Sequence, residues 1–223
     1  QLRGFVPDER IRLSSTGVDL ETFINWNITR KNKIITIGSF KWKKGYRYLL
    51  EAASLVFKRY PACRLVIVGD GEERQGIVNT IECLGLNKHV VLSGILPREE
   101  IVRVLNESKI FVMASVHEGL PKALLEALAC GTPAVVTKEC NAEGLIETTG
   151  LSVPPANSQA LAKAIIMLLE DMELWEKCSR NGPEVAKYYD WQAVAARDYA
   201  VYRELFAEGV REPQSVDKSQ EML

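Results

Sequence analysis

The sequence predicts an α/β domain built on a doubly wound parallel sheet. Short runs of β-branched and other apolar residues, such as residues 33–38 (KIITIG), are typical of strands buried on both faces. Longer segments between them carry apolar residues at helical spacing, so strand and helix alternate along most of the chain. The 223 residues, 47% of them hydrophobic, are enough to bury the core of one such domain.

Each strand is expected where apolar residues run with little interruption. These runs lie at 33–38, 64–69, 90–92, 110–114, 134–137 and 151–153. The first two close on Gly38 and Gly69, which suit a tight exit from a strand. No run is long enough for an independent helix of the usual length, which favours strands.

Each helix is expected where apolar residues recur every three or four positions. These segments lie at 45–60, 72–84, 98–107, 121–130, 158–170, 174–188 and 191–207. Pro61 and Gly85 end the first two, and Pro97 precedes the third. Pro121 suits the first position of the fourth helix, and Ser158 suits the N-cap of the fifth.

Composition narrows the class of partners and the compartment. A net charge of −1 gives no broad positive field, so nucleic acid is not an expected partner. The five cysteines form no CxxC pair, which argues against a disulfide framework or structural zinc and favours the cytoplasm. No apolar run is long enough to span a bilayer, and the N-terminus does not resemble a signal peptide. The chain begins with Gln1 rather than Met, which suggests a processed protein or, as we expect, a piece of a longer one.

Ligands of open parallel sheets bind outside the carboxyl ends of the strands. The candidate site therefore consists of the loops that follow the predicted strands, and these loops begin at Gly38, Gly69, Gly94, Ala114 and Thr137. The first loop carries three lysines just before a helix, where the helix dipole favours an anion. It is a candidate phosphate site, although on composition alone a solvated lysine cluster is an equal alternative.

The loop 115–121 (SVHEGLP) and the helix after it carry two glutamates at different depths. Glu118 stands at the helix start, and Glu126 follows eight residues later. Such a pair could accept hydrogen bonds from two sets of hydroxyls. A carboxylate beside a helix N-terminus is also a simple dipole-favoured cap, and for Glu118 alone that alternative stays open.

Four motifs in this order at the strand ends resemble the donor-binding half of family 4 glycosyltransferases. They are TGVDLETF, GSFKWKKGYRYLLEA, LVIVGDGEER and EGLPKALLEALACGTPAVVT. The resemblance covers residues 10–207 and implies the C-terminal, Rossmann-like half of a GT-B enzyme, which has two facing domains. On this basis residues 1–30 are a linker from a missing N-terminal acceptor domain, and residues 31–208 are the donor domain. The C-terminal helices close this fold, and the last of them, 191–207, would return toward the missing domain. Residues 209–223 are polar and are expected to be a disordered tail.

The resemblance implies a nucleoside-diphosphate sugar donor and transfer with retention of configuration and without a metal ion. In this interpretation Lys44 grips the diphosphate, and Glu118 contacts the sugar hydroxyls; these two are the catalytic candidates. Glu126 holds the ribose, and the donor-binding candidates are completed by Gly38, Ser39, Gly69, Gly94, Gly119, Leu120 and Pro121. The sequence contains no D-x-D pair of the kind that chelates a metal bound to diphosphate.

Two positions depart from the family pattern. Members commonly place an arginine after the glycine of the first loop, and here that position is Ser39. Lys41 or Lys43 could compensate, but neither has the bidentate fork of arginine. Glu143 stands where relatives often have another donor-facing acid, but its loop lacks their paired glycines.

Three functions are weighed against these features. The first is the donor half of a glycosyltransferase, which is inactive without an acceptor-binding domain or chain. That missing half could also bring peripheral membrane contact. The second is a non-catalytic or regulatory subunit that binds a nucleotide sugar, which Ser39 mildly favours. The third, an NAD-dependent oxidoreductase, fails at Arg74, where its fingerprint needs a glycine.

Overall fold

The computed structural model describes residues 14–207, with residues 143 and 207 described by their backbone alone, and is built on a six-stranded parallel sheet. The strands are β1 (Lys31–Ile37), β2 (Arg64–Val68), β3 (Val90–Gly94), β4 (Ser108–Met113), β5 (Ala134–Thr137) and β6 (Gly150–Val153). Their order is β3-β2-β1-β4-β5-β6, and every neighbouring pair is parallel. The predicted doubly wound sheet is therefore confirmed, with its order reversing between β1 and β4.

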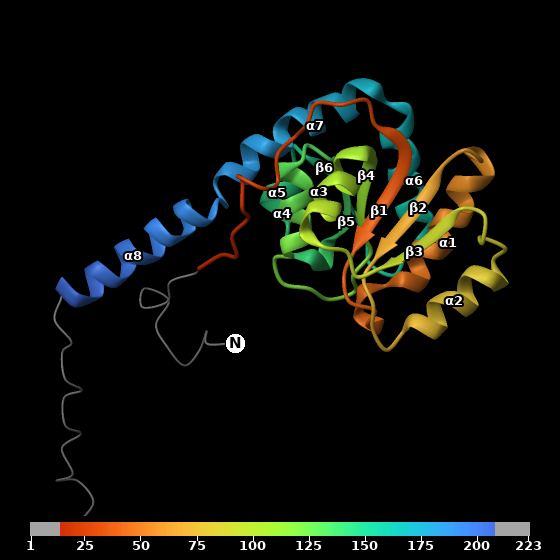
Figure 1. The fold of residues 1–223 in the computed structure, drawn as a ribbon, viewed down its shortest axis with the longest axis horizontal. Coiled ribbons are helices and arrows are strands. Elements are labelled where there is room, and N and C mark those ends of the chain that lie inside the picture. The colour runs from red at the N-terminus through yellow and green to blue at the C-terminus, as the bar shows by residue number, and fades with distance from the viewer. Residues whose placement is uncertain (1–13, 208–223) are drawn as a thin grey trace, which may run out of the picture.

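Helices cover both faces of the sheet (Figure 1). One core cluster joins the sheet to α1 (Tyr46–Arg59), α2 (Arg74–Cys83) and α6 (Ser158–Glu170). The other joins it to α3 (Arg98–Glu107), α4 (Lys122–Ala129) and α5 (Glu143–Ile146). The helix α7 (Met172–Lys187) contributes a buried residue to each cluster. The apolar faces expected from the sequence, such as Leu49 and Val56 of α1, are buried.

Most predicted element boundaries agree with the structure to within three residues, but two details are wrong. The N-cap of α6 is Asn157, whose side chain accepts a hydrogen bond from the Ala160 N–H at 2.9 Å. Ser158 lies inside the helix and donates to Glu51 at 2.6 Å instead. Pro121 is the N-cap residue of α4, one position before the helix. The short helix α5 was not predicted.

Residues 14–30 lie against the domain without forming a helix or strand of their own. Val18 and Phe23 are almost fully buried. The Arg30 guanidinium donates to the carbonyl oxygens of Leu105, Ser108 and Cys130 at 2.6–3.0 Å. Burial lowers the pKa of Arg30 to about 10. The predicted domain boundary at residue 30 stays a prediction, and residues 1–13 and 209–223 lie outside the described residues.

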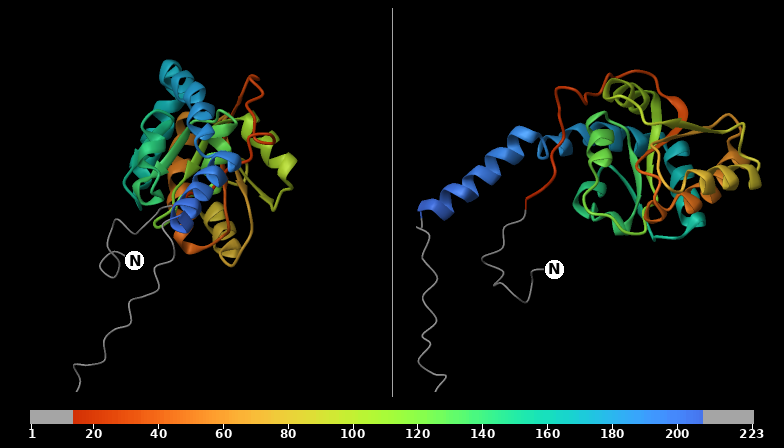
Figure 2. Two further views of the ribbon diagram at one scale, coloured as in Figure 1. Left: turned by 90° about the vertical axis from the view of Figure 1, so that its left-hand side faces the viewer. Right: turned by 60° about the horizontal axis from the view of Figure 1, so that its bottom comes forward.

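The helix α8 (Trp191–Ala207) leaves the body of the domain (Figures 1 and 2). Among residues 191–206 of this helix, only Val194 is buried. Tyr199, Tyr202 and Phe206 follow one another at helical spacing and are between 59% and 77% exposed. The far part of α8 therefore presents an aromatic stripe that no described residue covers.

Gly45 and Gly85 offer a test of a close contact in this fold. Both have φ of +66°, but a Cβ on Gly45 would lie 2.0 Å from the Ala114 carbonyl oxygen, whereas the space around Gly85 is open. We expect Gly85→Ala to cost about 1–2 kcal/mol, the penalty of the left-handed conformation. Gly45→Ala should cost about 3–5 kcal/mol, because overpacking adds to that penalty. Urea unfolding measures both, and equal losses would show that the contact is not tight.

Candidate functional site

Two loops at the carboxyl ends of β1 and β4 form the centre of the candidate site. The first covers residues 38–45 and leads into α1, and the second covers residues 114–121 and leads into α4. β1 and β4 are neighbours, and the strand order reverses between them. At such a switch point the two loops diverge to opposite faces and leave room for a ligand.

The two loops are held together by backbone contacts. The Val116 N–H donates to the Lys43 carbonyl oxygen at 2.8 Å. Gly45 lies against the Ala114 carbonyl, where no side chain could fit. Residues 42–44 form one turn of 3-10 helix, which turns Lys44 toward the second loop. These contacts set the side chains of the two loops side by side.

Lys44 and Glu118 form an ion pair at the centre of the site. The Lys44 Nζ lies 2.5 Å from a carboxylate oxygen of Glu118, and the two side chains are only 16% and 15% exposed. Lys43 Nζ lies 4.0 Å from the other oxygen. The structure thus brings together the two predicted catalytic candidates, and each neutralises the charge of the other.

The helices that begin at this pair have uncapped N-termini. Neither α1, with Gly45 at its N-cap, nor α4, with Pro121 there, receives a side-chain cap. The helices α2, α3 and α5 also lack a side-chain cap, whereas Asn157 caps α6 and Asp171 caps α7, so it is the ion pair beside them that sets the ends of α1 and α4 apart. First-turn N–H groups without an intrahelical partner are donors to an anion, and the helix dipole adds to the attraction. The site therefore offers a lysine and two helix ends to one negatively charged group.

The loop after β5 positions Glu118 in a way that the sequence did not indicate. The Glu118 N–H donates to the Glu139 carbonyl at 3.0 Å, and Asn141 Nδ2 donates to the Glu118 carbonyl at 2.7 Å. Asn141 has φ of +47°, a conformation that asparagine tolerates better than most residues. An asparagine shortly after a predicted strand was the only available signal. Glu143 begins α5 close by, but its side chain is outside the described part.

Glu126 is partly buried in α4 and lacks a described partner. No hydrogen bond or ion pair to its carboxylate is found among residues 14–207. Burial raises the pKa of Glu126, and the positive charges of Arg98 and Lys122 offset part of this effect. A carboxylate in this state gains most from a ligand that donates hydrogen bonds to it.

The remaining predicted donor-binding residues fall into two groups. Gly38 and Gly69 pack on each other, since a Cβ on Gly69 would lie 2.0 Å from the Gly38 carbonyl oxygen. Gly94 and Gly119 have open space around them, and Ser39 is exposed. Leu120 is half-buried and Pro121 is buried at the start of α4. Close loop packing therefore explains Gly69 without a ligand, whereas Gly94 and Gly119 leave room for one.

Comparison with known proteins gives the class of this domain. The family model of glycosyl transferases group 1 matches residues 20–185, and the chain belongs to that family. An alpha-D-kanosaminyltransferase of Streptomyces kanamyceticus is 31% identical over 77% of this chain and 45% of its own length. The chain spans about half the length of the curated relatives it matches.

Solved structures agree with this fold. The C-terminal domain of a glycosyl transferase group 1 family protein from Francisella tularensis has a TM-score of 0.70 and is 26% identical; the match covers 78% of this chain and all of that domain. Anabaena HepE, solved in complex with UDP, has a TM-score of 0.83 at 20% identity, over 92% of this chain and 60% of its own. Across the described residues no helix is long and apolar enough to cross a membrane.

Glu126→Gln is expected to stabilise the ligand-free domain at neutral pH by about 0.5–2 kcal/mol, as other favourable substitutions do. The amide removes a partly buried charge that has no described partner. Because the folded-state pKa lies above the ordinary 4.5, wild-type stability should fall as the pH rises through the interval between these two values and then stay constant.

Denaturant unfolding of wild type and Glu126→Gln across a series of pH values measures this difference in stability. The difference should be small below pH 4.5 and should grow above it before levelling off. Glu82→Gln, at an exposed position on α2, is the matched control and should change little. A Glu126→Gln domain that is less stable at neutral pH would show that the carboxylate has a structural partner.

Proposed function

We propose that this domain binds a nucleoside-diphosphate sugar and is the donor half of a retaining, metal-independent glycosyltransferase of family 4. The observation that carries the proposal is the Lys44–Glu118 pair at two uncapped helix N-termini. One partner suits a diphosphate and the other suits sugar hydroxyls, so a donor could bind both side chains by separating them. The family membership of the chain supports the same function.

The proposed chemistry follows from where charge develops. When the sugar–phosphate bond breaks, its electron pair goes to the diphosphate oxygen, and positive charge develops at the sugar carbon. Lys44 and the N-termini of α1 and α4 stabilise the departing diphosphate more than the intact donor. Glu118 accepts hydrogen bonds from the sugar hydroxyls and stabilises the developing positive charge. No metal ion is required in this scheme, because the lysine and the helix ends neutralise the leaving group.

Glu126 is assigned to the nucleoside end of the donor. Its carboxylate is partly buried and lies one to two turns inside the helix whose N-terminus binds phosphate. The two hydroxyls of a ribose would supply the hydrogen bonds that it lacks. This contact would anchor the nucleoside while Lys44 and Glu118 act on the diphosphate and the sugar.

The acceptor belongs to a domain or chain outside the described residues. The aromatic stripe of α8, defined by Tyr199, Tyr202 and Phe206, is the surface on which we place that partner. Exposed aromatic side chains at helical spacing are typical of a helix that packs on another protein surface. In the cytoplasm, which the free cysteines favour, this partner would also supply any peripheral membrane contact.

Ser39 favours a second candidate function, that of a regulatory subunit. Where the family commonly has an arginine, this exposed serine cannot hold phosphate with a bidentate guanidinium. A regulatory subunit that binds a nucleotide sugar without transferring the sugar would tolerate that loss. Such a subunit would still partner an acceptor-binding chain through α8.

Lys44→Ala should weaken binding of a nucleoside diphosphate by about 1.5–3 kcal/mol, because a charged hydrogen bond to phosphate is lost. Calorimetry with UDP, GDP and ADP selects the nucleotide and measures the change. The matching nucleoside should bind equally to both proteins. Lys58→Ala, at an exposed position on α1, is the control. Equal losses for nucleoside and diphosphate would place Lys44 away from phosphate, and no binding of any nucleotide to wild type would refute a donor site.

A further inference from the structure

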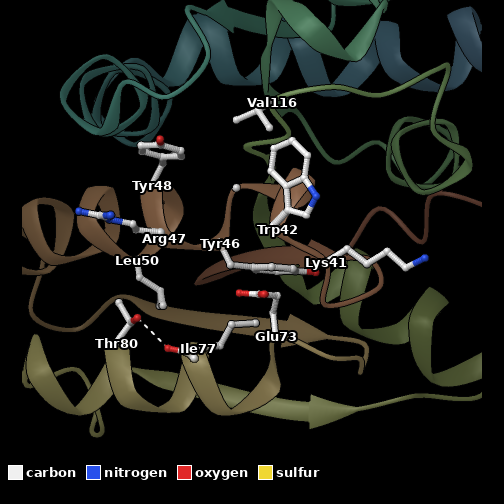
Figure 3. A pocket seen from close by; sticks show the side chains of 12 residues that line it. Lys41, Trp42, Tyr46, Arg47, Tyr48, Leu50, Glu73, Ile77, Thr80 and Val116 are labelled. Atoms are coloured by element: carbon white, nitrogen blue, oxygen red, sulfur yellow. Dashed lines mark hydrogen bonds between the residues drawn. The ribbon is translucent and has the colours of Figure 1, made fainter.

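A separate pocket of about 350 Å³ lies between α1 and α2, next to the first loop of the candidate site (Figure 3). It is lined by the start of α1, by one face of α2 and by Lys41 and Trp42 from the loop. Val116 of the second loop closes one side. None of the proposed donor contacts Lys44, Glu118 and Glu126 lines it, so the donor does not account for it.

Aromatic rings make up much of the pocket wall. Trp42 is 72% exposed, and Tyr48 is partly buried; Figure 3 shows both rings on the same side of the pocket. Tyr46 lies deeper, fixed by a hydrogen bond from its hydroxyl to the Gly38 carbonyl at 2.8 Å. A pyranose ring has apolar C–H faces that stack on such rings. The amphipathic character of tryptophan and tyrosine suits a ligand that is apolar on one face and hydroxylated at its rim.

The polar groups of the pocket suit hydroxyls better than phosphate. Lys41 and Glu73 carry opposite charges and have no ion pair among residues 14–207, whereas the guanidinium of Arg47, which also lines the pocket, is paired with Glu51 at 3.0 Å. The Thr80 hydroxyl donates to the Gly76 carbonyl at 2.7 Å and keeps its acceptor capacity. A phosphate would lie close to the Glu73 carboxylate and be repelled. A neutral sugar could instead donate to Glu73 and Thr80 and accept from Lys41.

Gly76 points to a ligand independently of these side chains. It is the third residue of α2, and glycine in a helix costs up to about 1 kcal/mol relative to alanine. No close packing demands it, because a Cβ there would meet only the Glu73 carboxylate oxygen, at an ordinary 3.6 Å. The missing side chain does, however, leave space at the pocket wall. A helix that gives up stability to keep a pocket open is expected where the pocket is used.

We propose that this pocket binds a neutral sugar ring of the acceptor glycan. The pocket adjoins the donor site through shared loops, since Gly45 and Val116 line it and are within two residues of Lys44 and Glu118. A sugar held there would extend from the reacting acceptor unit along the donor half. The acceptor assignment rests on the proposed function, whereas binding of the sugar itself does not.

The test is a titration of the full 223-residue chain with methyl glycosides of glucose, mannose, galactose and N-acetylglucosamine, followed by amide and indole NMR signals. At least one glycoside should shift the signals of Trp42 and Thr80 and leave that of Trp175 unchanged. Trp42→Ala should weaken its binding at least about tenfold, and Trp26→Ala should not. If no glycoside shifts Trp42 at high millimolar concentration, the proposal is wrong.

A second variant tests the pocket without changing the loop that carries Trp42. Gly76→Leu fills the pocket with a better helix former, so the domain should remain folded while glycoside binding falls at least about tenfold. Gln75→Leu, at the exposed neighbouring position, is the matched control. Unchanged binding in Gly76→Leu, or a shift at Thr80 on α2 caused by UDP, would overturn the pocket assignment. Glycoside binding in a chain that gives no nucleotide response at Lys44 would refute the donor proposal and with it the acceptor role.

Discussion

The contact between Gly45 and the Ala114 carbonyl determines where the functional groups of this domain lie. It allows the loops after β1 and β4 to meet at the point where the sheet order reverses. The hydrogen bond from the Val116 N–H to the Lys43 carbonyl then fixes the position of one loop against the other. As a result Lys44 from the first loop and Glu118 from the second form an ion pair. The neighbouring pocket depends on the same contact, because Gly45 and Val116 line it.

The ion pair between Lys44 and Glu118 keeps the ligand-free site electrostatically balanced. Two charges that are each about 15% exposed would be costly to leave alone, and pairing them offsets that cost. A ligand must therefore offer both an anion and hydrogen-bond donors to replace the pair. Burial raises the pKa of Glu126, and its carboxylate has no partner among residues 14–207, so a ligand that donates hydrogen bonds to it would stabilise the domain. The proposed donor, which carries phosphate, sugar and ribose in one molecule, would meet all three of these groups.

The sequence predicted the elements that are buried and missed the contacts between loops. Continuous apolar runs identify the strands, since a parallel sheet is covered on both faces. The support of Glu118 by Asn141 and Glu139 has no periodic pattern, because it joins loops that follow different strands. Asn157 and Ser158 are both residue types that suit an N-cap. Asn157 takes that position because the side chain of Ser158 is hydrogen-bonded to Glu51, a residue distant in the sequence.

That α8 closes the fold and returns toward the missing half was implied by the family resemblance alone. The spacing of apolar residues indicated that α8 is a helix but not that it leaves the body (Figure 1). Its residues show an amphipathic pattern whether the apolar face packs on this domain or on another protein. The pocket between α1 and α2 was also missed, because its wall combines side chains from elements about thirty residues apart, such as Tyr48 and Thr80. Gly76 could have drawn attention as a glycine inside a predicted helix.

The central claim is that Lys44 and Glu118 hold each other until a donor separates them. Calorimetry of Glu118→Ala with a nucleoside diphosphate, with and without its sugar, tests this most directly. In the variant, Lys44 does not have to break an ion pair with Glu118 before it binds phosphate. The bare diphosphate should therefore bind to the variant at least as tightly as it binds to the wild type. The gain in affinity that the sugar provides should disappear, because the hydroxyls lose their acceptor. Equal weakening of both ligands would show that Glu118 supports the loop and would contradict this account.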